Sequence, residues 1–71
     1  MNKFTYGSLV VKQCTRSTWE ARHWGRALVG RVYQDEAGYL VKGPYYRPVG
    51  RCNSLDGALD MLRQEIRKQV A

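Results

Sequence analysis

The sequence predicts an α+β fold, a small antiparallel β-meander of three to four strands packed on one C-terminal amphipathic helix. Two observations lead to this fold class. Apolar residues recur at helical spacing near the C-terminal end, and the residues before them form short runs of strand formers separated by turn residues. Because these runs are closely spaced, consecutive strands are expected to pair with one another. The 71 residues predict a single small basic domain over 1–71, with the sheet in about 4–52 and the helix in about 54–69.

Residues 8–14 are rich in strand-forming side chains and are expected to form the first strand. Residues 18–24 are open to two interpretations. Apolar residues alternate with charged ones there, as in a half-buried strand, whereas Ser17 and Glu20 have the spacing of a helix capping box. We favour the strand, because Gly25 follows as a turn residue and a meander needs no longer connection.

A β-hairpin is expected in the middle of the chain. Residues 27–33 are rich in strand formers, and residues 34–38 are typical of a turn, with Gly38 suited to a positive φ. The strand pattern resumes over residues 39–42. A glycine and a proline then end it, so residues 43–51 are interpreted as a loop.

The C-terminal helix is expected to begin after Asn53 and Ser54, whose side-chain oxygens can accept hydrogen bonds from unpaired backbone N–H groups. The apolar stripe of this helix consists of Leu55, Leu59, Leu62 and Ile66. Burying each of these side chains on the sheet would contribute about 1.5–3 kcal/mol. The helix is therefore expected to cover one face of the sheet and to leave the other face open to solvent.

Positive charge is concentrated in the part of the chain that precedes the helix. Residues 1–52 carry nine basic and three acidic side chains, whereas residues 53–71 carry three of each. The net charge of +6 therefore belongs entirely to the predicted sheet region. With the helix on one face of the sheet, the cations are expected to gather on the other. A field of one sign on one surface favours a polyanion, or a protein that handles one, as the partner.

Two groups of residues are candidates for binding a partner. Strand alternation would turn Leu28 and Val32 toward the helix and Arg31 toward solvent. The first group lies on or near that outward face and consists of Arg22, Arg26, Arg31, Tyr33 and Lys42. The second group lies in the following loop, where tyrosine rings can stack on bases and guanidinium groups can bond phosphates; it consists of Tyr45, Tyr46, Arg47 and Arg51. The alternatives are a solvated face and a structural loop whose tyrosines pack at the rim of the domain.

No catalytic residue, cofactor or metal site is expected, and the chain is predicted not to be an enzyme. The single histidine, His23, and the two cysteines, Cys14 and Cys52, provide neither an oriented catalytic dyad nor four convergent metal ligands. Trp19 and Trp24 are interpreted as core residues, because they are the largest apolar side chains available to a small core. If either is exposed, it becomes a candidate anchor for a partner.

These features favour a small basic module that binds DNA or RNA through its arginine- and tyrosine-rich sheet face and loop. The expected layout, a short meander followed by one amphipathic helix, resembles that of several small DNA-binding domains, including the N-terminal arm-binding domains of phage-type integrases. The resemblance implies that the sheet lies across a groove or a phosphate backbone. Binding would then fall steeply with salt and show little sequence preference.

A protein partner is the alternative. A small basic chain without catalytic residues is typical of accessory proteins from phages and mobile elements, and some of these, such as anti-CRISPR proteins, inhibit a host complex by docking on it. The arginines would then meet an acidic surface of that complex. No signal peptide, membrane span or membrane partner is expected, so the predicted location is the cytoplasm. A homodimer would bury more surface than a domain of this size can alone, and the sequence leaves it open.

Overall fold

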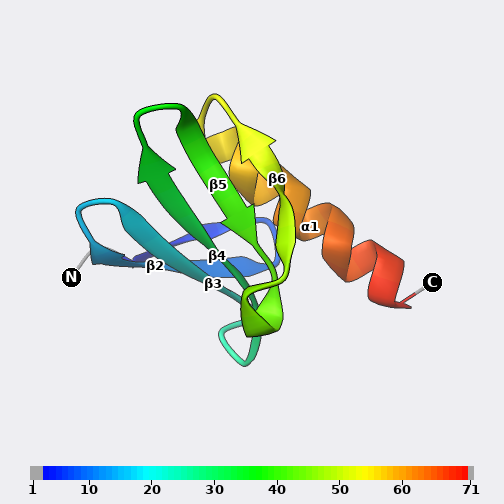
Figure 1. Ribbon diagram of the computed structural model, residues 1–71. Helices are drawn as coiled ribbons and strands as arrows, with labels where there is room; N and C mark the ends of the chain where they lie inside the picture. Colours follow the sequence, from blue (N-terminus) through cyan, green and yellow to red (C-terminus); the bar gives the residue numbers. More distant parts are fainter. Residues whose placement is uncertain (1–2, 71) are drawn as a thin grey trace.

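A computed structural model describes residues 3–70, with the side chains of residues 3–67. This part of the chain forms one antiparallel sheet of six strands, in which each strand pairs with its neighbours in the sequence. One helix follows the strands and lies against one side of the sheet (Figure 1). The elements in order are β1 (Lys3–Tyr6), β2 (Leu9–Thr15), β3 (Thr18–His23), β4 (Ala27–Asp35), β5 (Gly38–Lys42), the 3₁₀ turn η1 (Pro44–Tyr46), β6 (Pro48–Cys52) and α1 (Leu55–Val70).

The α+β class is confirmed, but the prediction of three to four strands is wrong, because two edge strands were missed. β1 is short and almost entirely exposed, so its sequence lacks the alternation of apolar and polar residues by which a half-buried strand is predicted. β6 lies inside the segment interpreted as a loop. It begins at Pro48, which has no N–H to give to a sheet but is tolerated at the start of an edge strand. The strand interpretation of residues 18–24 is confirmed by β3.

The core lies between the sheet and α1. Alternate residues of the strands form its sheet side, which includes Leu9, Val11, Trp19, Ala21, Val32 and Val41. The helix contributes Ala58, Leu59 and Leu62, all of them fully buried. α1 begins as the sequence predicts, because the Ser54 hydroxyl oxygen accepts a hydrogen bond from the Gly57 N–H at 3.1 Å. The helical stripe therefore packs on the apolar face of the sheet, as its spacing predicts.

A β-bulge interrupts the pairing of β3 with β4. Ala21 lies opposite Gly30, but the next residue of β3, Arg22, lies opposite Leu28, so Val29 is the extra residue. A bulge shifts the alternation of the strand that contains it. Val29 is accordingly buried in the core, and Leu28 lies on the same side of the sheet as Arg22. The prediction that Leu28 points toward the helix is therefore wrong, because it assumed unbroken alternation through β4.

Gly30 sets how closely α1 approaches the sheet. A methyl group at this position would overlap both the Lys42 carbonyl oxygen of the neighbouring strand and the Leu62 side chain of α1. The φ angle of Gly30 is not in the left-handed region, so the requirement for glycine is steric. The absence of a side chain lets Leu62 pack directly on the backbone of β4, between the two layers.

Substituting Gly30→Ala is expected to lower the free energy of unfolding by about 1–3 kcal/mol, because the extra methyl group would push both α1 and β5 away from β4. Urea denaturation followed by far-UV circular dichroism measures the change. Gly43→Ala is the matched control, since a methyl group there meets its nearest neighbours at 3.6 and 3.7 Å, which is ordinary contact. Equal losses in the two variants would contradict the steric argument.

Candidate functional site

The face of the sheet opposite α1 carries a row of charged residues. Lys3, Lys12, Glu20, Arg31 and Lys42 lie directly opposite one another, each on the next strand, from β1 to β5. Residues opposite one another in an antiparallel pair share a face. The buried residues Val11 and Val32 are sequence neighbours of this row, so the row faces away from the core. At about 4.8 Å per strand, the row is about 19 Å long.

We call this surface the open face. The side chains that define it are those of the row and of Val10, Arg22, Leu28, Tyr33, Leu40 and Arg51, which the strand register places on the same side. Within residues 3–67 its charged side chains are six cations, with Glu20 and the strand-end residue Asp35 as the two carboxylates. The open face is therefore strongly positive.

Glu20 lies at the centre of the row and binds two arginines. Arg22 Nε donates a hydrogen bond to Glu20 Oε1 at 2.8 Å, and Arg31 Nη2 lies 3.6 Å from Glu20 Oε2. The hydrogen bond from Arg22 holds the pKa of the Glu20 carboxyl below its ordinary value, with further lowering by the charges of Arg22, Arg31 and Lys12 and partial opposition from burial. The carboxylate thus stays ionised and fixes the two guanidinium groups in place.

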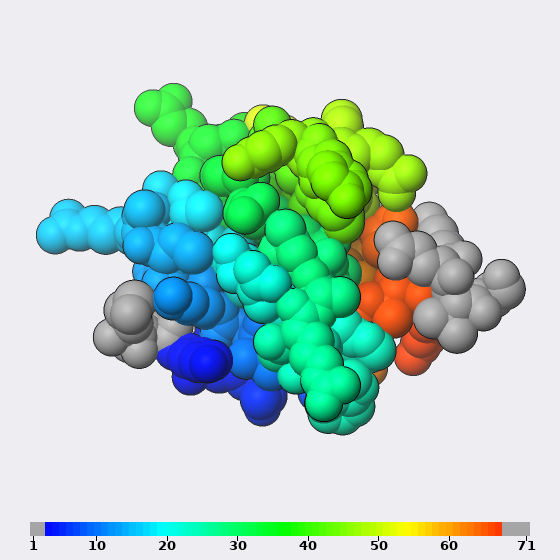
Figure 2. All heavy atoms as spheres, turned by 90° about the horizontal axis from the view of Figure 1, so that it is seen from below, coloured from blue at the N-terminus to red at the C-terminus, as the bar shows by residue number. Residues whose placement is uncertain are grey.

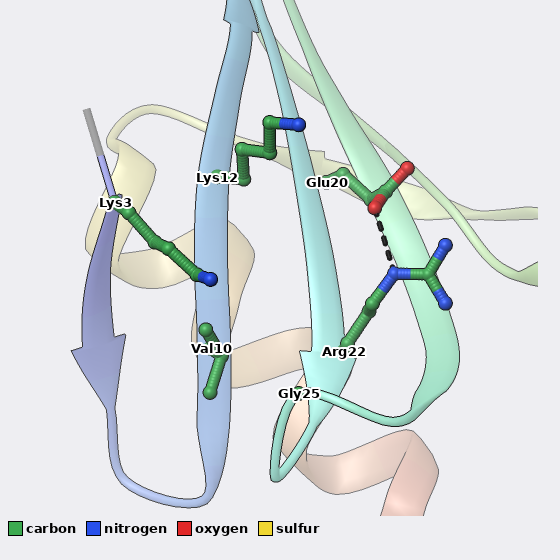
Figure 3. A pocket seen from close by; sticks show the side chains of 6 residues that line it. All are labelled: Lys3, Val10, Lys12, Glu20, Arg22 and Gly25. Atoms are coloured by element: carbon green, nitrogen blue, oxygen red, sulfur yellow. Dashed lines mark hydrogen bonds and ion pairs between the residues drawn. The ribbon is translucent and has the colours of Figure 1, made fainter. Parts of the chain in front are cut away.

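The lysines of the row have no such partner. No carboxylate within residues 3–67 lies at ion-pair distance from Lys3, Lys12 or Lys42. Lys3, Lys12, Glu20 and Arg22 surround a shallow hollow of about 340 Å³, in which Lys3 extends from β1 across β2 (Figure 3). The Lys42 amino group lies 5.8 Å from the centre of the Tyr33 ring, a cation–π contact that leaves its N–H donors available.

The structure divides the predicted site residues into three groups. Arg22, Arg31, Tyr33, Lys42 and Arg51 share the open face, where Arg51 also pairs with Asp35 at 2.9 Å. Arg47 instead reaches α1, with its Nη2 3.5 Å from Glu65. The remaining predicted residues, Arg26, Tyr45 and Tyr46, lie at one end of the sheet in the β3–β4 turn and in η1.

Three residues of the row, Lys3, Lys12 and Glu20, were not among the predicted site residues. Lys3 was missed because β1 was not recognised as a strand. Lys12 lies in the strand expected over residues 8–14 and alternates with Val11, so its outward position could have been found from the pattern alone. What the sequence did not provide was the register that brings both lysines into line with Glu20.

Trp24 is exposed, so its interpretation as a core residue is wrong, whereas Trp19 is buried as expected. The three-residue β3–β4 connection, Trp24–Arg26, contains a β-turn in which Arg26 N–H donates to the His23 carbonyl oxygen at 3.0 Å. Both central residues of this β-turn have positive φ, 54° at Trp24 and 76° at Gly25, as in a type I′ turn. Trp24 therefore projects from the tip of a hairpin, where its side chain cannot pack against core residues.

Other chemistry is sparse in the described part of the chain. Among the described residues, no three His, Cys, Asp or Glu side chains are grouped so that they could hold a metal ion. Both cysteines are free; Cys14 is exposed, and the Cys52 sulfur lies 3.1 Å from that of Met61. Across residues 3–70, no helix combines the length and apolar character that crossing a membrane requires.

Stability is expected to fall in acid partly through Glu20. The pKa of the Glu20 carboxyl is lowered in the folded state. The contribution of Glu20 to the free energy of unfolding is therefore complete above the ordinary pKa of 4.5 and is lost as the pH falls through the lower, folded-state pKa. Glu20→Gln should cost up to about 1 kcal/mol near neutral pH and less below about pH 4. Denaturation series at several pH values measure this difference. Glu36→Gln, in the exposed β4–β5 turn, is the control, and an equal pH dependence in both variants would contradict the assignment.

Comparisons with known proteins point to no relative. No protein-family model, curated protein or solved structure matches this chain. The resemblance in layout to small DNA-binding domains therefore stays a prediction. The features of this chain that bear on function are the open face and the end of the sheet that carries Trp24, Tyr45 and Tyr46.

Proposed function

We propose that this chain is a non-enzymatic nucleic-acid-binding module, and that the open face binds the phosphate backbone. The observation that carries the proposal is the row from Lys3 to Lys42, in which four of five aligned positions are cations. Phosphate groups along a nucleic-acid strand form a line of negative charge, and a row of cations across a sheet is complementary to it.

The length of the row is sufficient for several phosphates. Its extent of about 19 Å corresponds to about five or six nucleotides of a B-form strand, at about 3.4 Å per nucleotide along the axis. The unpaired ammonium groups of Lys3, Lys12 and Lys42 can each take one phosphate. Each contact releases condensed counterions, so the affinity should depend steeply on salt.

The arginines of the open face can take part although Glu20 holds them. A guanidinium group has five N–H donors, and the contacts with Glu20 use only part of this set. Because Glu20 holds Arg22 and Arg31 in place, their remaining N–H donors lose less conformational freedom when a phosphate binds, and the entropic cost of binding is smaller. Glu20 therefore orients the two arginines while reducing the total charge that they present.

Backbone contacts of this kind carry no sequence information, so we expect little preference among sequences. A protein with an acidic surface would meet the same cations, and it is the alternative outcome of the experiments below. Such a partner would bind after nuclease treatment, and the free chain would show no affinity for oligonucleotides at any salt concentration. Affinity for oligonucleotides that falls with salt supports the module proposed here.

Lys12→Gln is expected to weaken binding several-fold near physiological salt, because one phosphate contact is lost, and to reduce the slope of log K against log salt by about 1. Fluorescence anisotropy with a labelled oligonucleotide of about 20 residues, titrated at about 50–300 mM KCl, measures both quantities. Arg67→Gln changes the net charge by the same amount on the exposed side of α1 and should leave the slope unchanged. Equal effects of the two variants would show that net charge alone, and not the row, determines binding.

Glu20→Gln is expected to strengthen binding in the same assay, although it weakens the fold. Removing the central carboxylate raises the local positive charge and frees the guanidinium groups of Arg22 and Arg31 for phosphates. A gain of several-fold near 100 mM salt is expected, about what one added phosphate contact supplies. Glu36→Gln removes the same charge from a turn and controls for net charge. A loss of affinity in Glu20→Gln would mean that fixed arginines matter more to binding than added charge.

A further inference from the structure

One end of the sheet gathers exposed aromatic side chains. η1 lies beside the first part of β4, which follows the β3–β4 turn directly, since residues of β4 and η1 line one groove and these segments are adjacent in the view from below (Figure 2). The exposed fractions are 68% for Trp24, 96% for Tyr45 and 60% for Tyr46. We call these three residues the aromatic end. Phe4, the other large exposed apolar residue in the described part, lies away from it on β1.

The backbone holds these three rings in place at a cost. Within residues 3–70, Trp24, Tyr45 and Tyr46 are the three non-glycine residues with positive φ, at 54°, 62° and 62°. For a bulky side chain this region is strained by about 1–3 kcal/mol per residue. Burial does not compensate for the strain, because all three rings face solvent. Strain kept at exposed positions is typical of binding sites.

Two grooves adjoin the rings. One, of about 640 Å³, is lined by Ala27, Leu28, Arg31, Pro44, Tyr45 and Tyr46. The other, of about 610 Å³, is lined by His23, Trp24, Arg26 and Ala27, so the two meet at Ala27. The bulge in β4 is what brings Leu28 into the first groove. The two grooves together form one surface of aromatic, aliphatic and cationic side chains that runs from Trp24 to Tyr45 and Tyr46.

Cations surround this surface. The Arg31 guanidinium lies 5.5 Å from the centre of the Tyr46 ring, and Arg22 Nη1 donates to the Arg26 carbonyl oxygen at 2.9 Å, which braces the turn beneath Trp24. Among the described residues, no carboxylate lines either groove. Arg31 also belongs to the charged row, so the row and the aromatic end form one surface.

Flat ring faces beside guanidinium groups suit a nucleobase with its phosphate. A base inside a duplex has both faces covered by its neighbours, so only an unpaired base can lie on these rings. We infer that the aromatic end stacks unpaired bases, and that the preferred ligand of the module is single-stranded nucleic acid. This inference rests on the proposed function and names its substrate class: a strand whose phosphates follow the row and whose bases reach Trp24, Tyr45 and Tyr46.

The experiment compares a single strand with a duplex of the same length, at fixed salt, for wild type and for Trp24→Asn and Tyr45→Asn. Asparagine tolerates positive φ, so both variants remove a ring while keeping the turn. The wild type should bind the single strand at least about tenfold more tightly than the duplex, and each variant should lose about tenfold for the single strand only. The salt slope should not change, since no phosphate contact is removed. Phe4→Thr is the control and should bind as wild type.

Tryptophan fluorescence gives a direct second readout. Stacking should quench the emission of Trp24 when the single strand is added. The emission of the buried Trp19 should stay constant, and it can be measured by itself in the Trp24→Asn variant. Equal affinities for single strand and duplex, unaffected by Trp24→Asn, would overturn this inference and leave salt-dependent backbone binding intact. If neither oligonucleotide binds at low salt, the proposed function falls as well, and the aromatic end becomes a candidate anchor for an acidic protein.

Discussion

The contact between Leu62 and the bare backbone of Gly30 is the constraint on which the rest of this molecule depends. It lets α1 lie close enough to bury the apolar side of every central strand. Because successive side chains of a strand point to opposite faces of a sheet, covering one face with α1 leaves every second side chain on the open face. The open face can therefore be filled with cations without any charge entering the core, where an unpaired charge would be costly. Packing on one side and charge on the other are consequences of the same alternation.

At Glu20, the demands of stability and of the proposed phosphate binding oppose each other. Cations directly across from one another in a sheet repel, and a carboxylate among them offsets this repulsion. The same carboxylate weakens the field that an anionic ligand would meet. A row made only of lysine and arginine would attract phosphates more strongly, but it would hold its arginines less firmly and strain the strand pairing. If the open face binds phosphates as proposed, the carboxylate at the centre of the row balances these two demands.

The sequence was most informative where local pattern decides structure. The spacing of Leu55, Leu59 and Leu62 and the cap at Ser54 were sufficient to place α1, and turn residues were sufficient to place the hairpin of β4 and β5. The edge strands could not be found in this way, because β1 is exposed and β6 begins with proline. In such segments the hydrogen bonds to the neighbouring strand, rather than the local sequence pattern, determine that a strand forms.

The features that define the candidate site were also nonlocal. The bulge at Val29 exists only in the pairing of β3 with β4, so no pattern within β4 could show that Leu28 joins Arg31. Trp24 was misplaced because a small domain was expected to bury its largest apolar side chains, whereas the turn formed with Gly25 leaves this one exposed. Charge was easier to assign, since the alternation of Arg31 with Val32 needs no knowledge of the neighbouring strands.

The order of the elements has a consequence for how the chain is made. All six strands precede α1, so a growing chain can pair its hairpins one after another as they leave the ribosome. Until the helix has been synthesised, however, the apolar face that includes Leu9, Val11 and Val41 has nothing to cover it. The nascent sheet is then at its most prone to aggregation, and the synthesis of α1 converts this aggregation-prone intermediate into a folded domain.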